Sequence, residues 1–168
     1  MKNNHLKASS YILLLIIFLI GINIYKDFGI SVDEVGYRHQ GITIAYTLAK
    51  YLNLDLIESL PVDKNFVDII TYKKQEMFSG VPFHLYTIIV EYFSGLNNKI
   101  DIFQIKNLNS FLFFFVNLFF FSQILRLNLI NPNFSIFGLL FLVLSPRIFT
   151  ESFYNPNDIP FMNSMIIL

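Results

Sequence analysis

The sequence predicts an all-helical membrane protein, a polytopic bundle with a long outer loop that contains amphipathic surface helices. Of its 168 residues, 54% are hydrophobic and only 14% are charged, whereas soluble domains carry about 25% charged residues. Long uncharged apolar runs alternate with polar segments, and apolar residues recur at helical spacing within those polar segments. Lipid is therefore expected to be the main solvent of the chain.

The charge balance and the cysteine content exclude several classes of function. Twelve basic residues balance twelve acidic ones, so no net field indicates a nucleic-acid partner. The chain has no Cys and can form neither a disulfide framework nor a thiolate metal site. Its sequence also lacks a glycine-rich phosphate loop, a nucleophile elbow and a zinc-ligand spacing. Soluble nucleotide-dependent chemistry is therefore not indicated.

The first predicted span is residues 8–25, ASSYILLLIIFLIGINIY. It carries no charge, and its length suits a hydrocarbon core of about 30 Å. Lys2 and Lys7 precede it, so the positive-inside rule places the N-terminus in the cytoplasm. A cleaved signal peptide is the competing interpretation, but no A-x-A-like cleavage site follows the apolar run.

Residues 26–106 form a long polar segment, which this topology places on the outer face. In its first helical stretch the spacing is that of a helix lying on a membrane surface, with the apolar face at Tyr37, Gly41, Ile44, Leu48 and Leu52. In its second, Pro82 suits a first helical turn, residues 83–93 are largely apolar, and Gly95 provides a stop. Residues 53–78 show no strong period and are expected to be irregular or to form short helices.

Three further apolar runs follow the outer loop. Residues 108–125 form the second predicted span, in which three uncharged polar side chains can bond to neighbouring helices in lipid: Asn117, Ser122 and Gln123. Residues 134–147 form the third span, and a shorter outer loop over residues 150–160 follows. Residues 159–168 begin a fourth run, about half the length of a span. The chain is therefore expected to be the N-terminal part of a longer protein.

Two acidic residues, Asp33 and Glu34, lie just beyond the first span. Ser31 and Glu34 fit a capping box, which gives Glu34 a structural role, and Asp33 also suits the positive end of a helix dipole. Asp33 is nevertheless placed where a carboxylate can meet the headgroup of a lipid substrate. Arg38 and His39 follow one turn later, where they can form weak surface ion pairs or hold a lipid phosphate.

A second group of polar residues follows the third span: Arg147, Glu151, Asn155, Asn157 and Asp158. Asn157 or Asp158 can simply cap the fourth helix, and a role in a site is equally open. By the predicted topology both outer loops face the same side of the membrane, so their acidic groups are expected to converge at one pocket. His84 and Glu91 share a helix face about 10 Å apart and are interpreted as interfacial polar groups.

Three features together indicate a family. They are a first span followed by GISVDE, a long outer loop with amphipathic helices, and a third span that ends in LSPRIFTESFYNPNDIPF. With these features the chain resembles the N-terminal part of bacterial membrane glycosyltransferases of the GT-C superfamily, relatives of protein O-mannosyltransferases and aminoarabinose transferases. Residues 145–161 are the more specific part. Asn157 stands where a Lys is expected, and His84 stands where relatives often have an acidic residue, so the substrate stays open.

The resemblance implies a multi-pass enzyme of the bacterial cytoplasmic membrane that transfers a sugar from polyprenyl phosphate on the outer side. Asp33 matches the essential Asp of the first outer loop and is expected to be the base of an inverting displacement, and Glu34 beside it is the second candidate catalytic residue. The residues expected to bind the substrate are Arg38, His39, Arg147, Asn155 and Asp158. The acceptor, a glycan, lipid or protein, is open, as is a divalent metal cofactor, for which the sequence offers no clear ligand set. The fragment alone is expected to be inactive.

A non-catalytic membrane protein is the main alternative: a transporter, an assembly subunit, or an inactive remnant of a transferase. Transporters place ionisable residues inside their spans, near the bilayer midplane. The complete predicted spans carry none. This favours chemistry at the membrane surface over a conduction path, and it leaves the interaction subunit and the inactive relative open.

Overall fold

The computed structural model describes residues 2–52, 81–96, 98–128, 133–155 and 157–167. Within these ranges the chain is helical and contains no strand, which confirms the predicted all-helical class. The chain divides into two compact units. Unit 1 comprises Met1–Gly29 and Lys106–Leu168, and unit 2 is Ile30–Ile105. Each unit is described below by itself.

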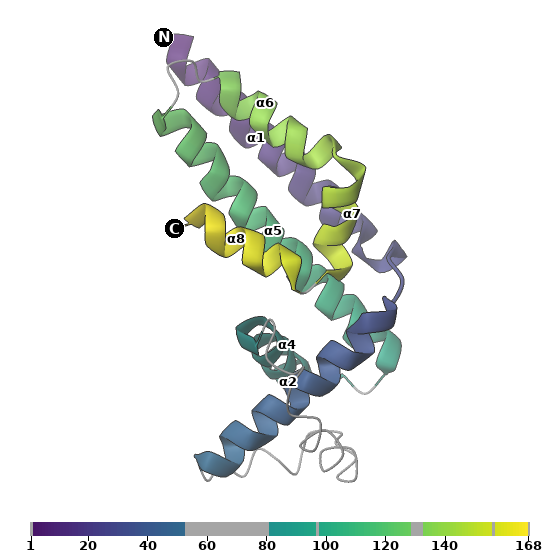
Figure 1. Ribbon diagram of the computed structural model, residues 1–168. Helices are drawn as coiled ribbons and strands as arrows, with labels where there is room; N and C mark the ends of the chain where they lie inside the picture. Colours follow the sequence, from purple (N-terminus) through teal and green to yellow (C-terminus); the bar gives the residue numbers. More distant parts are fainter. Residues whose placement is uncertain (1, 53–80, 97, 129–132, 156, 168) are drawn as a thin grey trace. The chain divides into compact units, whose positions relative to one another are not determined.

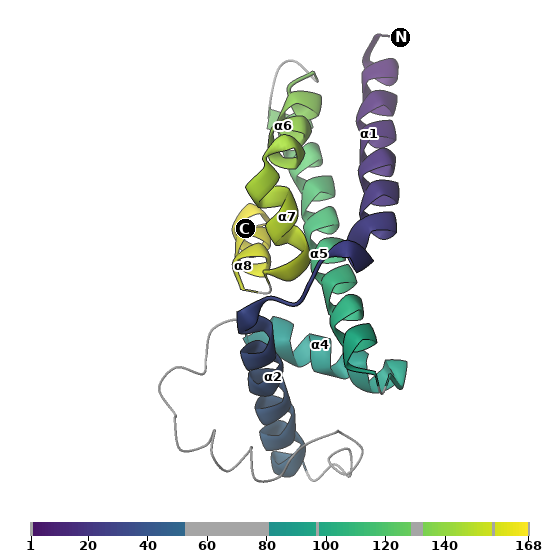
Figure 2. The same cartoon turned by 90° about the vertical axis from the view of Figure 1, so that its right-hand side faces the viewer.

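Among the described residues, two helices are long and apolar enough to cross a membrane. The first belongs to α1 (Lys2–Ile24), and the second to α5 (Lys99–Asn128). Helices suit such surroundings because their backbone groups are hydrogen-bonded within the segment. The second helix begins at Lys99, earlier than the predicted span at residues 108–125. Figures 1 and 2 both show α1, α5 and α6 (Asn133–Leu144) side by side in unit 1.

The predicted third span, residues 134–147, is not a single straight helix. The helix α6 ends before Pro146, where α7 (Pro146–Tyr154) begins, and the two are bent by 68°. The cause is local, because a proline removes a helical hydrogen bond and disfavours the α conformation in the residue before it. The bent pair counts as a third crossing only if it forms one span. In addition, α7 occupies the first half of the loop expected over residues 150–160.

Apolar side chains from α1, α5, α6, α7 and α8 (Asp158–Ile167) form the core of unit 1. Its buried members are Leu14, Ile17, Phe111, Phe114, Leu118, Leu139, Phe153 and Ile159. Three rings stack within it, since the Phe153 centroid lies 4.1 Å from that of Phe28 and 4.9 Å from that of Phe111. Each such pair contributes about 0.5–1.5 kcal/mol beyond area burial. The bend at Pro146 therefore leads into a helix that is anchored in the core.

Polar side chains join neighbouring helices of unit 1, in part as the sequence predicts. Gln123 Nε2 donates to the Tyr11 hydroxyl at 3.5 Å, and Ser135 Oγ donates to the backbone carbonyl of Ser122 at 3.3 Å. Asn117 is fully buried, but its amide makes no hydrogen bond to a described residue. The expected interhelical bonding of a side chain thus holds for Gln123, whereas the Ser122 hydroxyl donates to the Phe119 carbonyl of its own helix.

Unit 2 is built on the contact between α2 (Val32–Tyr51) and α4 (Val81–Ser94), which cross in Figure 2. Gly41 makes the contact possible, because a Cβ at this position would lie 2.7 Å from the backbone oxygen of His84. As predicted, Gly95 follows the end of α4, and its φ of 62° is readily adopted by glycine. Residues 53–78, expected to be irregular, lie outside the described residues.

The structure corrects the face assigned to the first surface helix. Tyr37 and Gly41 were expected to begin a lipid-facing stripe of α2, but both pack against α4. Farther along the same stripe Leu48 is exposed. The spacing identified an apolar face of this helix, and the tertiary structure shows that α4 covers the first half of that face.

We predict that Gly41→Ala separates α2 from α4. The new methyl group meets a backbone carbonyl that cannot rotate away, and we expect overpacking to cost about 1–3 kcal/mol. Gly36→Ala is the matched control, because a Cβ at Gly36 meets nothing within 4 Å. The control should gain up to about 1 kcal/mol from helix propensity. Amide hydrogen exchange of residues 83–92 in the full chain measures both effects, and equal protection in the two variants would contradict the assignment.

Candidate functional site

The structure separates the two acidic residues at the start of α2. Glu34 is fully buried, and its Oε2 accepts the backbone N–H of Ser31 at 2.9 Å as part of the predicted capping box. Asp33 lies in the same helical turn but is exposed, and its side chain makes no hydrogen bond or ion pair within the described part of the chain. Glu34 therefore stabilises the helix end, whereas the carboxylate of Asp33 is accessible to a ligand.

Arg38 is not a solvated surface cation. Its Nε donates to Glu91 Oε2 at 2.9 Å, and its Nη2 pairs with Glu91 Oε1, so two parallel bonds join α2 to α4. The side chains are 18% and 8% exposed. A bidentate pair of this kind is stronger and more directional than a single ion contact. Arg38 is thus committed to a carboxylate of its own chain.

His39 is partly buried beside this pair. Burial, and then the positive charge of Arg38, lower the pKa of its imidazole below the ordinary value of 6.5. The neutral form therefore dominates near pH 7. In that form the imidazole has one donor and one acceptor nitrogen, but it brings no positive charge to a phosphate.

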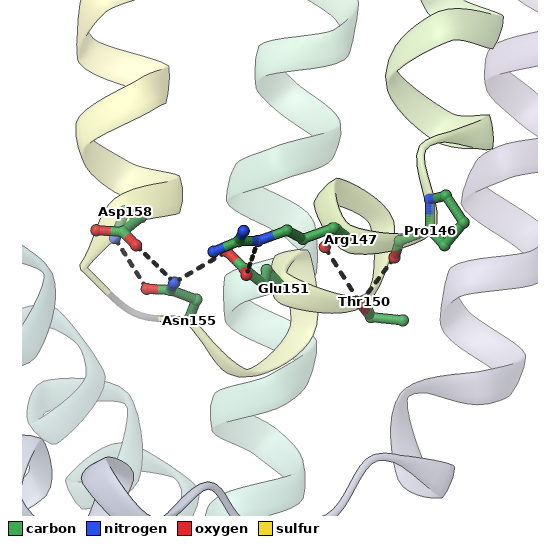
Figure 3. Close-up of polar contacts among 6 residues, drawn as sticks. All are labelled: Pro146, Arg147, Thr150, Glu151, Asn155 and Asp158. Atoms are coloured by element: carbon green, nitrogen blue, oxygen red, sulfur yellow. Dashed lines mark hydrogen bonds and ion pairs between the residues drawn. The ribbon is translucent and has the colours of Figure 1, made fainter.

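A polar network joins α7 to α8, as Figure 3 shows. We call it the Asn155 network and define it as Arg147, Glu151, Asn155 and Asp158. Asn155 Nδ2 donates to Asp158 Oδ2 at 2.8 Å and to Glu151 Oε2 at 3.2 Å. Its Oδ1 accepts the backbone N–H groups of Asn157 and Asp158 at 3.2 and 2.9 Å. Asn155 thereby satisfies free amides at the start of α8, a role the sequence assigned to Asn157 or Asp158.

Arg147 is the exposed cation of the Asn155 network. Its Nε donates to Glu151 Oε1 at 2.9 Å, and its side chain is 87% exposed. Because this single bond uses one of five donors, the outer edge of the guanidinium remains available to an anion. Arg147 is therefore better placed to meet a phosphate than Arg38 or His39.

The predicted site residues fall into two groups. Asp33, Glu34, Arg38 and His39 lie in unit 2, and Arg147, Asn155 and Asp158 lie in unit 1. The structure brings residues together within each group, and the expected convergence of the two outer loops stays a prediction. Among the described residues, no group of three or more His, Cys, Asp or Glu side chains could hold a metal ion.

Two contacts of the candidate residues leave no signal in the sequence. Glu91 was interpreted as an interfacial polar group, and its partner Arg38 is 53 positions away. His84 stacks on Tyr37 with ring centroids 5.0 Å apart. His84 and Glu91 do share one face of α4, as their spacing predicts, and that face is turned toward α2. Only the fold identifies what each of them meets.

Comparisons with known proteins add no assignment: no family model, curated protein or solved structure matches this chain. The resemblance to GT-C glycosyltransferases therefore stays an expectation drawn from the order of spans and from short motifs.

We predict that unit 2 loses stability as the pH falls below about 7. The unfolded chain protonates His39 near pH 6.5, whereas the folded chain does so only at lower pH. The unfolded state therefore binds more protons in this range. His39→Gln should reduce the difference in opening free energy between pH 7.5 and pH 5, as measured by amide exchange in α2. An imidazole that titrates at or above pH 6.5 in an NMR titration would refute this prediction.

We predict that Asn155→Ala loosens the start of α8. The change removes the acceptor of two backbone amides and the donor to two carboxylates, and we expect a cost of about 1–2 kcal/mol. Faster exchange of the Asn157 and Asp158 amides measures it. Thr150→Val is the matched control, because Thr150 bonds only to carbonyls of its own helix among the described residues. An equal effect of both variants on those amides would argue against the network.

Proposed function

We propose that this chain belongs to a membrane-bound glycosyltransferase. It transfers a sugar from a polyprenyl-phosphate donor to an acceptor at the outer face of a bacterial cytoplasmic membrane, with Asp33 as the general base. The order of the apolar helices and the GISVDE and SPRIF…NPNDIPF segments support this proposal through the resemblance to GT-C enzymes. Two helices that are long and apolar enough to cross a membrane are consistent with it.

The observation that carries the proposal is the difference between two adjacent carboxylates. Glu34 is buried in the capping box, and Asp33 is exposed without a partner in the described chain. A general base must reach the proton that it removes and must not be held in a structural bond. These two conditions favour Asp33 over Glu34 as the proposed base.

The chemistry needs only one carboxylate. In an inverting displacement the acceptor oxygen attacks the anomeric carbon, and Asp33 takes the proton of the acceptor hydroxyl as in inverting glycosidases. The bond between the anomeric carbon and the phosphate oxygen breaks, and polyprenyl phosphate leaves with the electron pair. This leaving group is already anionic, so it needs positive charge rather than an acid. The proposal assigns that charge to Arg147, whose guanidinium is exposed.

We predict that Asp33→Asn abolishes sugar transfer by the full-length protein. Loss of a general base typically lowers the rate by about 10²–10⁴-fold. The measurement uses membrane vesicles, a panel of radiolabelled polyprenyl-phosphate sugars, and transfer of label out of the lipid fraction. Asp27→Asn is the matched control, because Asp27 is another exposed carboxylate beyond the end of α1. It should keep the parental rate.

Two outcomes would contradict the proposal. A parental rate in Asp33→Asn would remove Asp33 from the chemistry while leaving a transferase in place. Absence of transfer from every donor by the parental protein, in vesicles where it is folded and abundant, would favour the non-catalytic membrane protein. A separate variant, Arg147→Gln, tests the phosphate contact. We expect it to weaken donor binding more than it lowers the transfer rate at saturating donor.

A further inference from the structure

The helix α4 buries an unusual share of polar side chains within unit 2. The buried side chains of α4 are the polar His84, Thr87 and Glu91 and the apolar Phe83 and Ile88. Glu91 forms the ion pair with Arg38 of α2, and His84 stacks on Tyr37. In a helix pair folded in water, the contact face is apolar and the opposite face is polar. In α4, three of the five buried side chains are polar or charged, including the one carboxylate of the helix.

The opposite face of α4 is an exposed apolar stripe. We define it as Pro82, Tyr86, Ile89 and Phe93, which recur at steps of four, three and four and so lie along one line of the helix. Phe93 is 80% exposed and Ile89 is 45% exposed. Tyr92 lies at the edge of the stripe and is also exposed. The described part of α4 therefore shows no charged side chain on its outward face.

Two properties of this stripe indicate a lipid rather than a protein as its partner. Glu91, the one carboxylate of α4, is paired with Arg38 and does not reach the stripe. The stripe therefore carries no charge, and burying an unpaired charge in lipid would be costly. Tyr side chains at the edges of an apolar surface are typical of the membrane interface, where the ring is buried and the hydroxyl is hydrated.

The covalent connection of α4 restricts where the stripe can lie. Only Gly95 to Asn98 separate α4 from α5, and a linker of this length reaches at most about 18 Å. The helix α5 contains a candidate membrane span. With 14 residues, α4 is about 21 Å long and too short to cross a hydrocarbon core of about 30 Å. A helix tethered to a span and too short to cross can place an apolar face in lipid by lying along the interface.

We propose that α4 lies in the membrane interface with the stripe of Pro82, Tyr86, Ile89 and Phe93 inserted among lipid chains, and with α2 covering its polar face. The sequence alone assigned the lipid-facing stripe to α2. The structure points instead to α4, because the first half of the α2 stripe is covered. This inference does not depend on transferase activity.

A single tryptophan tests the proposal directly, because the chain contains no Trp. Phe93→Trp and Ile89→Trp are made separately in the full chain and reconstituted into phosphatidylcholine vesicles with bromine on the acyl chains. Both positions are exposed, so the substitutions leave the contact with α2 intact. Leu19→Trp is the positive control, because Leu19 is an exposed apolar residue inside the candidate span of α1. Free N-acetyltryptophanamide gives the aqueous limit.

The proposal predicts strong quenching at both positions, greatest with bromine near the headgroup, and weak quenching by acrylamide in water. Leu19→Trp should be quenched most by bromine deeper in the chain. Quenching by acrylamide comparable to the free amide would place the stripe in water and overturn the proposal. Protection from both quenchers would show that protein covers the stripe, either a second copy or another partner, and would overturn it as well.

Discussion

A chain this apolar must satisfy its polar groups within itself, and the rest of the structure depends on that constraint. Helices meet it for the backbone because each amide bonds within its own segment. For the side chains the clearest case is the pair of Arg38 with Glu91, where two bonds join α2 to α4. At the junction of α7 and α8, the Asn155 side chain likewise bonds to the Asp158 carboxylate and to a free backbone amide.

The ion pair determines orientation more than it adds stability. Desolvating two charges offsets much of their attraction, so the net contribution of such a pair is modest. Leaving one partner buried alone is costly, however, and this penalty disfavours any other register of α2 on α4. Gly41 and the stack of Tyr37 on His84 lie on the same face and are consistent with this register. In this register His84 and Glu91 of α4 face α2, so the apolar stripe of α4 faces outward.

Within each unit, the fold has already paired most of the polar side chains that the sequence proposed as site residues. Glu34 accepts a backbone amide at the start of α2, Arg38 pairs with Glu91, and Asn155 accepts backbone amides at the start of α8. Among the described candidate residues, this pairing leaves Asp33 open in unit 2 and the outer edge of the Arg147 guanidinium open in unit 1. Composition cannot make that distinction, because Asp33 and Glu34 are neighbours of the same charge. Their difference arises from helical geometry, which turns one carboxylate back to an N-cap and the other outward.

The sequence by itself determined the helical class, the two long apolar helices, the capping box and the stop at Gly95. Each of these depends on local properties: hydropathy over a span, the free amides of a first turn, or the φ angle of glycine. Tertiary structure alone decided the partner of Arg38, the helix that covers Tyr37 and Gly41, and the role of Asn155. The bend after Leu144 depends on both. Pro146 marks its position in the sequence, but only the tertiary structure shows that α7 packs Phe153 into the core of unit 1. Contacts between residues far apart in the chain leave no periodic signal, because their energy depends on which helix faces meet.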